Sequence, residues 1–176
     1  MNTLASKLLA TALITFTLGL AACGDNEEPA VEDLDMTAQD FGCILDWPQV
    51  ERFRVTNELG YQDEAEAVAR STSGGTYPVG TIIQVIPNEA MVKRREGWNP
   101  DTNDWEFFVL DTTAEGTSIV SRGGAEVVNP LGSCADCHAD AEPKWDLVCS
   151  DGHGCEPLPF TPEQILMVQE SDPRCQ

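Results

Sequence analysis

The sequence predicts a β-rich α+β domain built on an antiparallel sheet, flanked by an N-terminal helix and a short C-terminal helix. Three runs rich in β-branched and aromatic residues follow one another in the middle of the chain, at 80–86, 91–98 and 105–110. The last two are joined by a short segment of turn-forming residues, 99–104. Consecutive strands joined by short turns favour antiparallel pairing.

The N-terminal helix is expected at residues 46–58, closed by residues 57–60. Four of its residues recur at near-helical spacing: Trp47, Val50, Phe53 and Arg54. Residues 63–70 are rich in alanine and glutamate and predict a second, shorter helix before a loop at 71–77.

Two more elements follow the three strands. Residues 117–121 predict a fourth strand after a turn at 114–116. Near the C-terminus, Thr161-Pro162-Glu163-Gln164 is a capping box with proline at the first helical position. This signal predicts a helix over 162–170, which Pro173 prevents from continuing.

The N-terminus predicts export and a lipid anchor. Lys7 precedes an apolar run, residues 8–22, of the length of a secretory signal rather than a membrane span. Its end, Leu20-Ala21-Ala22-Cys23, resembles the lipobox of a bacterial lipoprotein, so Cys23 is expected to carry the lipid. The alternative is an ordinary signal peptide cut after Ala22. Gly24 in place of an aspartate favours the periplasmic face of the outer membrane over retention at the inner membrane.

Three segments are therefore expected: a signal peptide at 1–22, a flexible acidic tether at 23–40, and one domain at 41–176. The net charge is −20 at pH 7, which argues against nucleic acid and anionic lipid surfaces as partners. A basic redox partner protein would suit this charge. A solubility adaptation explains it equally well.

The most specific motif is Cys134-Ala135-Asp136-Cys137-His138, the CxxCH attachment signature of a c-type haem. Cys134 and Cys137 would form thioether bonds to one haem c, and His138 would be the axial iron ligand. One alternative is a CxxC disulfide that happens to precede a histidine. A remoter one is a structural zinc site that draws on the same residues together with Cys149, His153 and Cys155.

Four further cysteines form an even set that predicts two disulfides in an oxidising compartment: Cys43, Cys149, Cys155 and Cys175. Three pairings are possible and remain open. Three side chains are candidates by chemical type for a sixth iron ligand: His153, Met91 and Met167. Phe107 and Phe108 point to opposite faces if their strand is regular.

Three short motifs precede CxxCH in the sequence: Tyr77-Pro78-Val79-Gly80-Thr81, Glu89-Ala90-Met91-Val92-Lys93-Arg94 and Asp104-Trp105-Glu106-Phe107-Phe108. In this order the chain resembles cytochrome P460 and the related cytochromes c′-beta. The resemblance implies a mostly β fold, often a homodimer, with one axial histidine, an open distal face and binding of nitric oxide. It also implies that Glu89 is a distal proton acceptor, as in members that oxidise hydroxylamine.

One departure from that family concerns a lysine that cytochrome P460 proper cross-links to the haem. The matching strand here reads Ile82-Ile83-Gln84-Val85, and Lys93 is a poor substitute. The reading therefore moves toward the c′-beta type: a redox-active, five-coordinate iron that binds nitric oxide or related small nitrogen oxides. A six-coordinate electron-transfer cytochrome and a hydroxylamine-oxidising enzyme remain alternatives, so enzymatic activity is left open.

Overall fold

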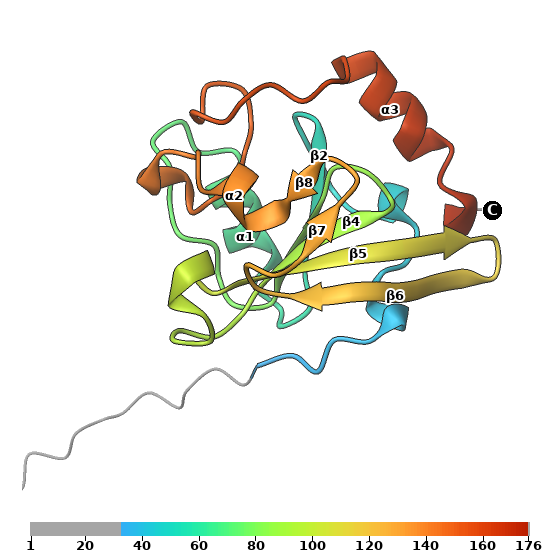
Figure 1. Cartoon of the computed structure of the whole chain (residues 1–176), viewed down its shortest axis with the longest axis horizontal. Coiled ribbons are helices and arrows are strands. Elements are labelled where there is room, and N and C mark those ends of the chain that lie inside the picture. The colour runs from blue at the N-terminus through green and yellow to red at the C-terminus, as the bar shows by residue number, and fades with distance from the viewer. Residues whose placement is uncertain (1–32, 176) are drawn as a thin grey trace, which may run out of the picture. The chain divides into compact units, whose positions relative to one another are not determined.

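The structure is a computed structural model that describes residues 33–175, and it has an α+β fold. Six strands form one antiparallel sheet in which neighbours along the chain are neighbours in the sheet (Figure 1). They are β1 (Gln49–Val50), β2 (Phe53–Asn57), β3 (Thr81–Gln84), β4 (Glu89–Lys93), β5 (Trp105–Thr113) and β6 (Gly116–Gly123). The predicted signal peptide, the predicted lipid site Cys23 and residues 23–32 of the predicted tether lie outside the described residues.

Three α-helices and a small hairpin complete the fold of residues 33–175. Helix α1 (Gln62–Ala69) connects β2 to β3, and α3 (Pro162–Glu170) lies near the C-terminus. Between β6 and α3, the hairpin β7 (Val128–Asn129) and β8 (Gly132–Ser133) leads directly into α2 (Cys134–His138). No helix within residues 33–175 has the length and apolarity needed to cross a membrane.

The predicted helix at 46–58 is wrong, because this segment forms the β1–β2 hairpin after a short 3-10 turn at Ile44–Asp46. In β2, Phe53, Val55 and Asn57 are buried while the residues between them are half-buried, which is the period of a strand. Three of the residues that fit a helical spacing lie on two different strands, Val50 on β1 and Phe53 and Arg54 on β2. The N-terminal helix of the fold is therefore α1, close to the second helix expected.

The four expected strands are confirmed, with different ends. Strand β4 begins at Glu89 and ends at Lys93, so the predicted extension to residue 98 is wrong. The chain turns there, with Gly97 at a φ of 78°. Strands β5 and β6 are longer than predicted and pair through an irregularity between Val109 and Leu110.

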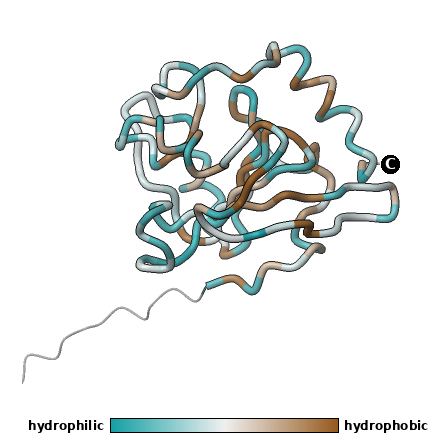
Figure 2. Tube along the Cα trace, in the orientation of Figure 1, coloured by the Kyte–Doolittle hydropathy of each residue, from teal (hydrophilic) through white to brown (hydrophobic). Residues whose placement is uncertain are grey.

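The central strands are buried on both faces of the sheet. Their residues are largely hydrophobic, as the brown segments of Figure 2 show. Phe107 packs on one face and Phe108 on the other, which confirms the expected alternation. The Phe107 face is covered by α1, α2 and the segment around Val148. The Phe108 face is covered by the N-terminal segment that contains Met36 and Phe41.

Part of the predicted tether belongs to this folded unit. Met36 is 3 % exposed, and its carbonyl accepts a hydrogen bond from Arg122 Nη1 at 2.7 Å. The Arg94 guanidinium donates to the carbonyl of Leu34 and to Glu106, which also pairs with Arg122. These contacts fix residues 33–40 against the sheet, so the ordered domain begins before residue 41.

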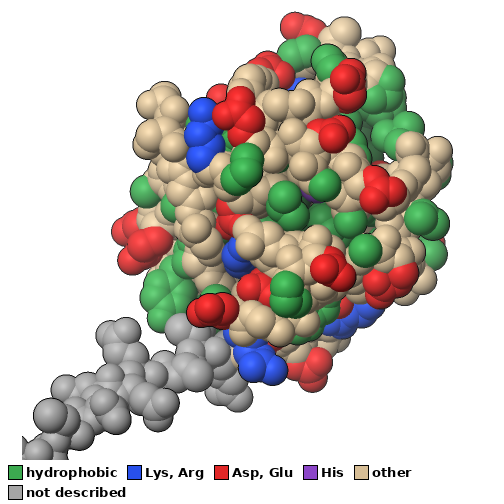
Figure 3. Space-filling model, turned by 60° about the vertical axis from the view of Figure 1, so that its left-hand side comes forward, with side chains coloured by type: hydrophobic (Ala, Val, Ile, Leu, Met, Phe, Trp, Pro, Cys, Tyr) green, Lys and Arg blue, Asp and Glu red, His purple; other side chains and the backbone are tan. Residues whose placement is uncertain are grey.

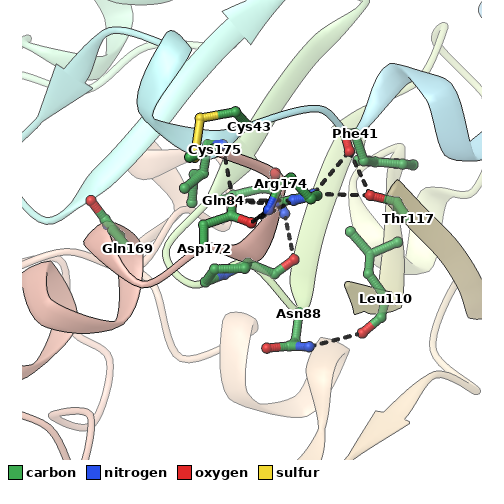
Figure 4. A network of polar contacts seen from close by, with 12 residues as sticks. Phe41, Cys43, Gln84, Asn88, Leu110, Thr117, Gln169, Asp172, Arg174 and Cys175 are labelled. Carbon is green, nitrogen blue, oxygen red and sulfur yellow. Dashed lines mark hydrogen bonds and ion pairs between the residues drawn. A yellow bond between two sulfur atoms is a disulfide. The ribbon is translucent and has the colours of Figure 1, made fainter. Parts of the chain in front are cut away.

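The four paired cysteines form Cys43–Cys175 and Cys149–Cys155, which selects one of the three possible connectivities. The first bridge ties the start of the domain to its end. Beside it, Arg174 Nη1 donates to the Phe41 carbonyl at 2.9 Å, and Asp172 accepts from the backbone N–H of Ile44 (Figure 4). The second bridge joins two cysteines that are only six positions apart in the sequence, in the loop between α2 and α3.

Candidate functional site

Helix α2 brings the three residues of the CxxCH motif together on one short turn. Its start is fixed by Ser133, whose Oγ accepts the backbone N–H of Asp136 at 3.2 Å. The backbone N–H of Cys134 donates to the Val127 carbonyl at 3.1 Å, which ties the turn to the segment before β7. The motif is therefore held by local capping and by the β7–β8 hairpin.

Cys134, Cys137 and His138 all line one cavity on the Phe107 face of the sheet. The space in front of these side chains measures about 790 Å³, a figure that includes the open solvent at its mouth. Most of the wall is apolar: Phe53, Ile83, Val85, Ala90, Met91, Phe107, Leu131, Val148 and Leu158. A second cavity shares Cys137 and His138 with the first. In Figure 3, hydrophobic side chains gather near the centre of the face shown, and carboxylates are scattered around them.

His138 is oriented by a backbone carbonyl. Its Nδ1 lies 2.7 Å from the carbonyl oxygen of Leu147, and its ring lies 5.2 Å from that of Phe107. Burial lowers the pKa of His138, against the opposing effect of this hydrogen bond, so the neutral ring donates from Nδ1. A neutral imidazole with Nδ1 engaged leaves Nε2 free as a metal ligand.

The carbonyl that orients His138 belongs to a strained turn. Asp146 and Leu147 have φ angles of 52° and 59°, a left-handed conformation that costs non-glycine residues about 1–3 kcal/mol each. Such a conformation persists only when surrounding contacts hold it.

Those contacts converge on Asp146, which is 2 % exposed. Its carboxylate accepts from Lys93 Nζ at 2.7 Å, from the backbone N–H of Tyr77 at 2.8 Å and from the amide of Asn103. Its carbonyl accepts from Trp105 Nε1 at 2.7 Å. A buried ion pair thus fixes the residue next to Leu147, and sequence reasoning missed it because the partners are far apart in the chain.

The two motif cysteines are not paired with each other. Burial raises the pKa of the Cys134 thiol to about 11, with smaller contributions from Glu89 and Cys137, and burial also raises the pKa of Cys137. Redox-active CxxC pairs have lowered thiol pKa values instead. These two thiols are therefore poor candidates for thiol–disulfide exchange.

The zinc alternative loses two of its ligands, because Cys149 and Cys155 are joined to each other. In the described part of the chain, no three His, Cys, Asp or Glu side chains are grouped so as to hold a metal ion. A single histidine beside two thiols in an apolar cavity fits a thioether-bound haem, whose porphyrin supplies four of the iron ligands.

Glu89 lines both cavities, at the start of β4. Its Oε1 accepts from Asn129 Nδ2 in β7 at 2.7 Å. Burial raises the pKa of Glu89, although the hydrogen bond from Asn129 opposes the shift. The sequence gives no signal for Asn129, because its contact with Glu89 spans 40 positions.

The candidates for a sixth iron ligand are separated by the fold. Met91 is 4 % exposed and lines the first cavity. His153 stacks on Trp145 at 3.8 Å and lines a different cavity, and Met167 is 64 % exposed on α3. Lys93 is held by Asp146 and does not line either cavity around His138.

These positions define a cavity with two thiols, one oriented imidazole and one carboxylate in its wall. Comparisons with models of protein families, with curated proteins and with solved structures found no match, so no family is assigned to this chain.

Proposed function

We propose that this chain is an exported, lipid-anchored mono-haem c-type cytochrome with a redox-active, five-coordinate iron that binds nitric oxide or a related small nitrogen oxide. One observation carries the proposal: Cys134, Cys137 and His138 share one turn in the wall of an apolar cavity, with Nδ1 of His138 already engaged. The resemblance of the sequence motifs to cytochrome P460 and the cytochromes c′-beta supports it.

Different residues of the site would attach the haem and bind its iron. Cys134 and Cys137 would attach the haem, and His138 would bind its iron through Nε2. The haem supplies the redox and ligand-binding chemistry of the iron. The mostly apolar wall would surround that centre, and Glu89, with its raised pKa, can accept a proton from a bound ligand.

Five-coordination is favoured by the composition of the cavity wall. Among the described residues that line it, His138 is the only histidine, and there is no lysine. Met91 is the one observation that favours a six-coordinate electron-transfer cytochrome, since a methionine is a common second axial ligand. Its position on a central strand, opposite Ile83 and Phe107, is equally that of a core residue.

The direct test is the mass and spectrum of the mature protein from a host with cytochrome c maturation. We expect the mass of one covalent haem, a high-spin spectrum, and a spectral change on anaerobic titration with nitric oxide. The matched control, Cys134→Ala with Cys137→Ala, should carry no covalent haem. A mature protein without the haem mass would refute the proposal.

Other results of the same titration would select an alternative. A low-spin spectrum that nitric oxide leaves unchanged would favour the electron-transfer cytochrome. Turnover of hydroxylamine with an electron acceptor would identify an enzyme with Glu89 as its proton acceptor.

Glu89 also gives a prediction on stability, because its pKa is raised by burial. A carboxyl with a raised folded-state pKa stabilises the fold fully only below its unfolded pKa, and this contribution is lost as pH rises through the folded value. Glu89→Gln is therefore expected to gain stability over the wild type as pH rises from about 4.5 toward 7. Chemical unfolding across this range measures the difference.

The control for this prediction is Glu115→Gln, at an exposed turn between β5 and β6. It should change the unfolding free energy equally at all these pH values. A pH-independent difference for Glu89→Gln as well would show that Glu89 carries no burial penalty.

The anchor and the partners complete the proposal. Cys23 would hold the domain at the periplasmic face of the outer membrane through its lipid. A homodimer and a basic redox partner protein are expected from the resemblance and from the net charge of −20, respectively.

A further inference from the structure

The two cavities around His138 have one cationic side chain among the described residues in their walls. It is Arg52, in the turn between β1 and β2, and it lines the second cavity. Glu89 and Glu156 line the same cavity, so the other charged side chains there are acidic. Of the described side chains that line this cavity, only Arg52 could pair with the charge of a bound anion.

The guanidinium of Arg52 has unused hydrogen-bonding capacity. Its side chain is 14 % exposed, and its one ion pair with a described residue joins Nη1 to Asp151 at 3.2 Å, a carboxylate that is 85 % exposed. Its Nε is buried and has no hydrogen-bond partner within residues 33–175. A buried donor without an acceptor is unfavourable, and more so when the group is charged. A ligand oxygen would satisfy it.

The backbone of Arg52, which carries the Nε donor, is held in place by α3. The Arg52 carbonyl accepts from Gln169 Nε2 on α3 at 2.9 Å, and the same Nε2 donates to the carbonyl of Val85 at 2.8 Å. Gln169 is fully buried, and Val85 lines both cavities. One side chain of α3 thus joins the Arg52 turn to the wall of the cavity.

We infer that Arg52 binds an oxyanion with two oxygens in one plane at the edge of this cavity, through Nε and a neighbouring N–H. An arginine fork matches such an anion with two parallel hydrogen bonds. The inference rests on the proposed function, which supplies two sources of this chemistry: a carboxylate of the haem, and a free anion such as nitrite. The haem carboxylate is the source that the geometry favours, because a haem that fills the apolar cavity must place its carboxylates at a polar edge.

The test compares Arg52→Gln with Arg95→Gln, which removes the same charge from a side chain that is 64 % exposed and lines neither cavity. Arg52→Lys keeps the charge without the fork and serves if the glutamine variant does not fold. Each protein is first weighed for covalent haem. Its midpoint potential is then measured against pH, and its affinity for nitrite is measured by absorbance.

Binding of the haem carboxylate predicts that the inflection of potential against pH moves to higher pH in Arg52→Gln and not in Arg95→Gln, because the carboxylate loses its cation. Binding of a free anion predicts an unchanged inflection and about ten-fold or greater loss of nitrite affinity in Arg52→Gln alone. If the two variants behave alike in both measurements while haem is present, the inference is overturned and the proposed function stands. A protein without covalent haem would overturn the proposed function and the haem carboxylate with it.

Discussion

Removing the Cys43–Cys175 bridge, by Cys43→Ala with Cys175→Ala, is expected to lower the free energy of unfolding by about 5 kcal/mol. The bridge closes a loop with a sequence separation of 132, so its loss restores a large conformational entropy to the unfolded chain. The folded state keeps other ties at this place. Arg174 still binds the Phe41 carbonyl, and Asp172 still accepts from Ile44. Urea unfolding measures the loss.

The matched control is the other bridge, removed by Cys149→Ala with Cys155→Ala. Its sequence separation is 6, for which the same entropy argument gives about 2 kcal/mol. Because Cys149 lines both cavities, this second pair of substitutions should also alter the haem spectrum, whereas the first should not. Equal losses of stability from the two bridges would contradict the chain-entropy explanation.

Much of the sheet follows from local sequence signals. The strands at β3, β5 and β6 and the helix α3 carry their own periodicity, turns and caps, and the sequence predicts them. The hairpin of β1 and β2 was missed because Val50, Phe53 and Arg54 fit a helical spacing by coincidence. The alternation of buried and half-buried residues along β2 depends on its pairing with β3, in which Val55 lies opposite Ile83. No local sequence pattern encodes this pairing.

In the candidate site too, some residues could be predicted from local sequence and others could not. CxxCH is a contiguous motif, so Cys134, Cys137 and His138 could be singled out from spacing alone. The groups that shape their surroundings are set by contacts across the fold. Arg52 reaches the cavity from the first hairpin, and the ion pair between Lys93 and Asp146 joins residues 53 positions apart. Such pairs become visible only when the chain is folded.

That ion pair leads to the second large expected effect, in Asp146→Ala. The substitution leaves Lys93, whose side chain is 7 % exposed, as a buried charge without its partner, and it removes the acceptor of the Tyr77 N–H. Removing one member of a buried pair typically costs about 3–5 kcal/mol. We expect a loss of this size in urea unfolding, against little change for Asp111→Ala at an exposed position of β5.

The same substitution tests how His138, the proposed axial ligand, is positioned. Asp146 holds the left-handed turn whose next carbonyl, that of Leu147, accepts from Nδ1 of His138. If this turn relaxes, the hydrogen bond weakens and His138 becomes a less basic ligand. In the haem-loaded protein, the iron–histidine stretching band should then move to lower frequency in Asp146→Ala and stay in place in Asp111→Ala. Asp146→Asn, which keeps an acceptor for Tyr77, gives an intermediate case if the alanine variant does not fold. A loss of stability with an unmoved band would mean that Asp146 supports the fold alone, and that the Leu147 carbonyl keeps its place without it.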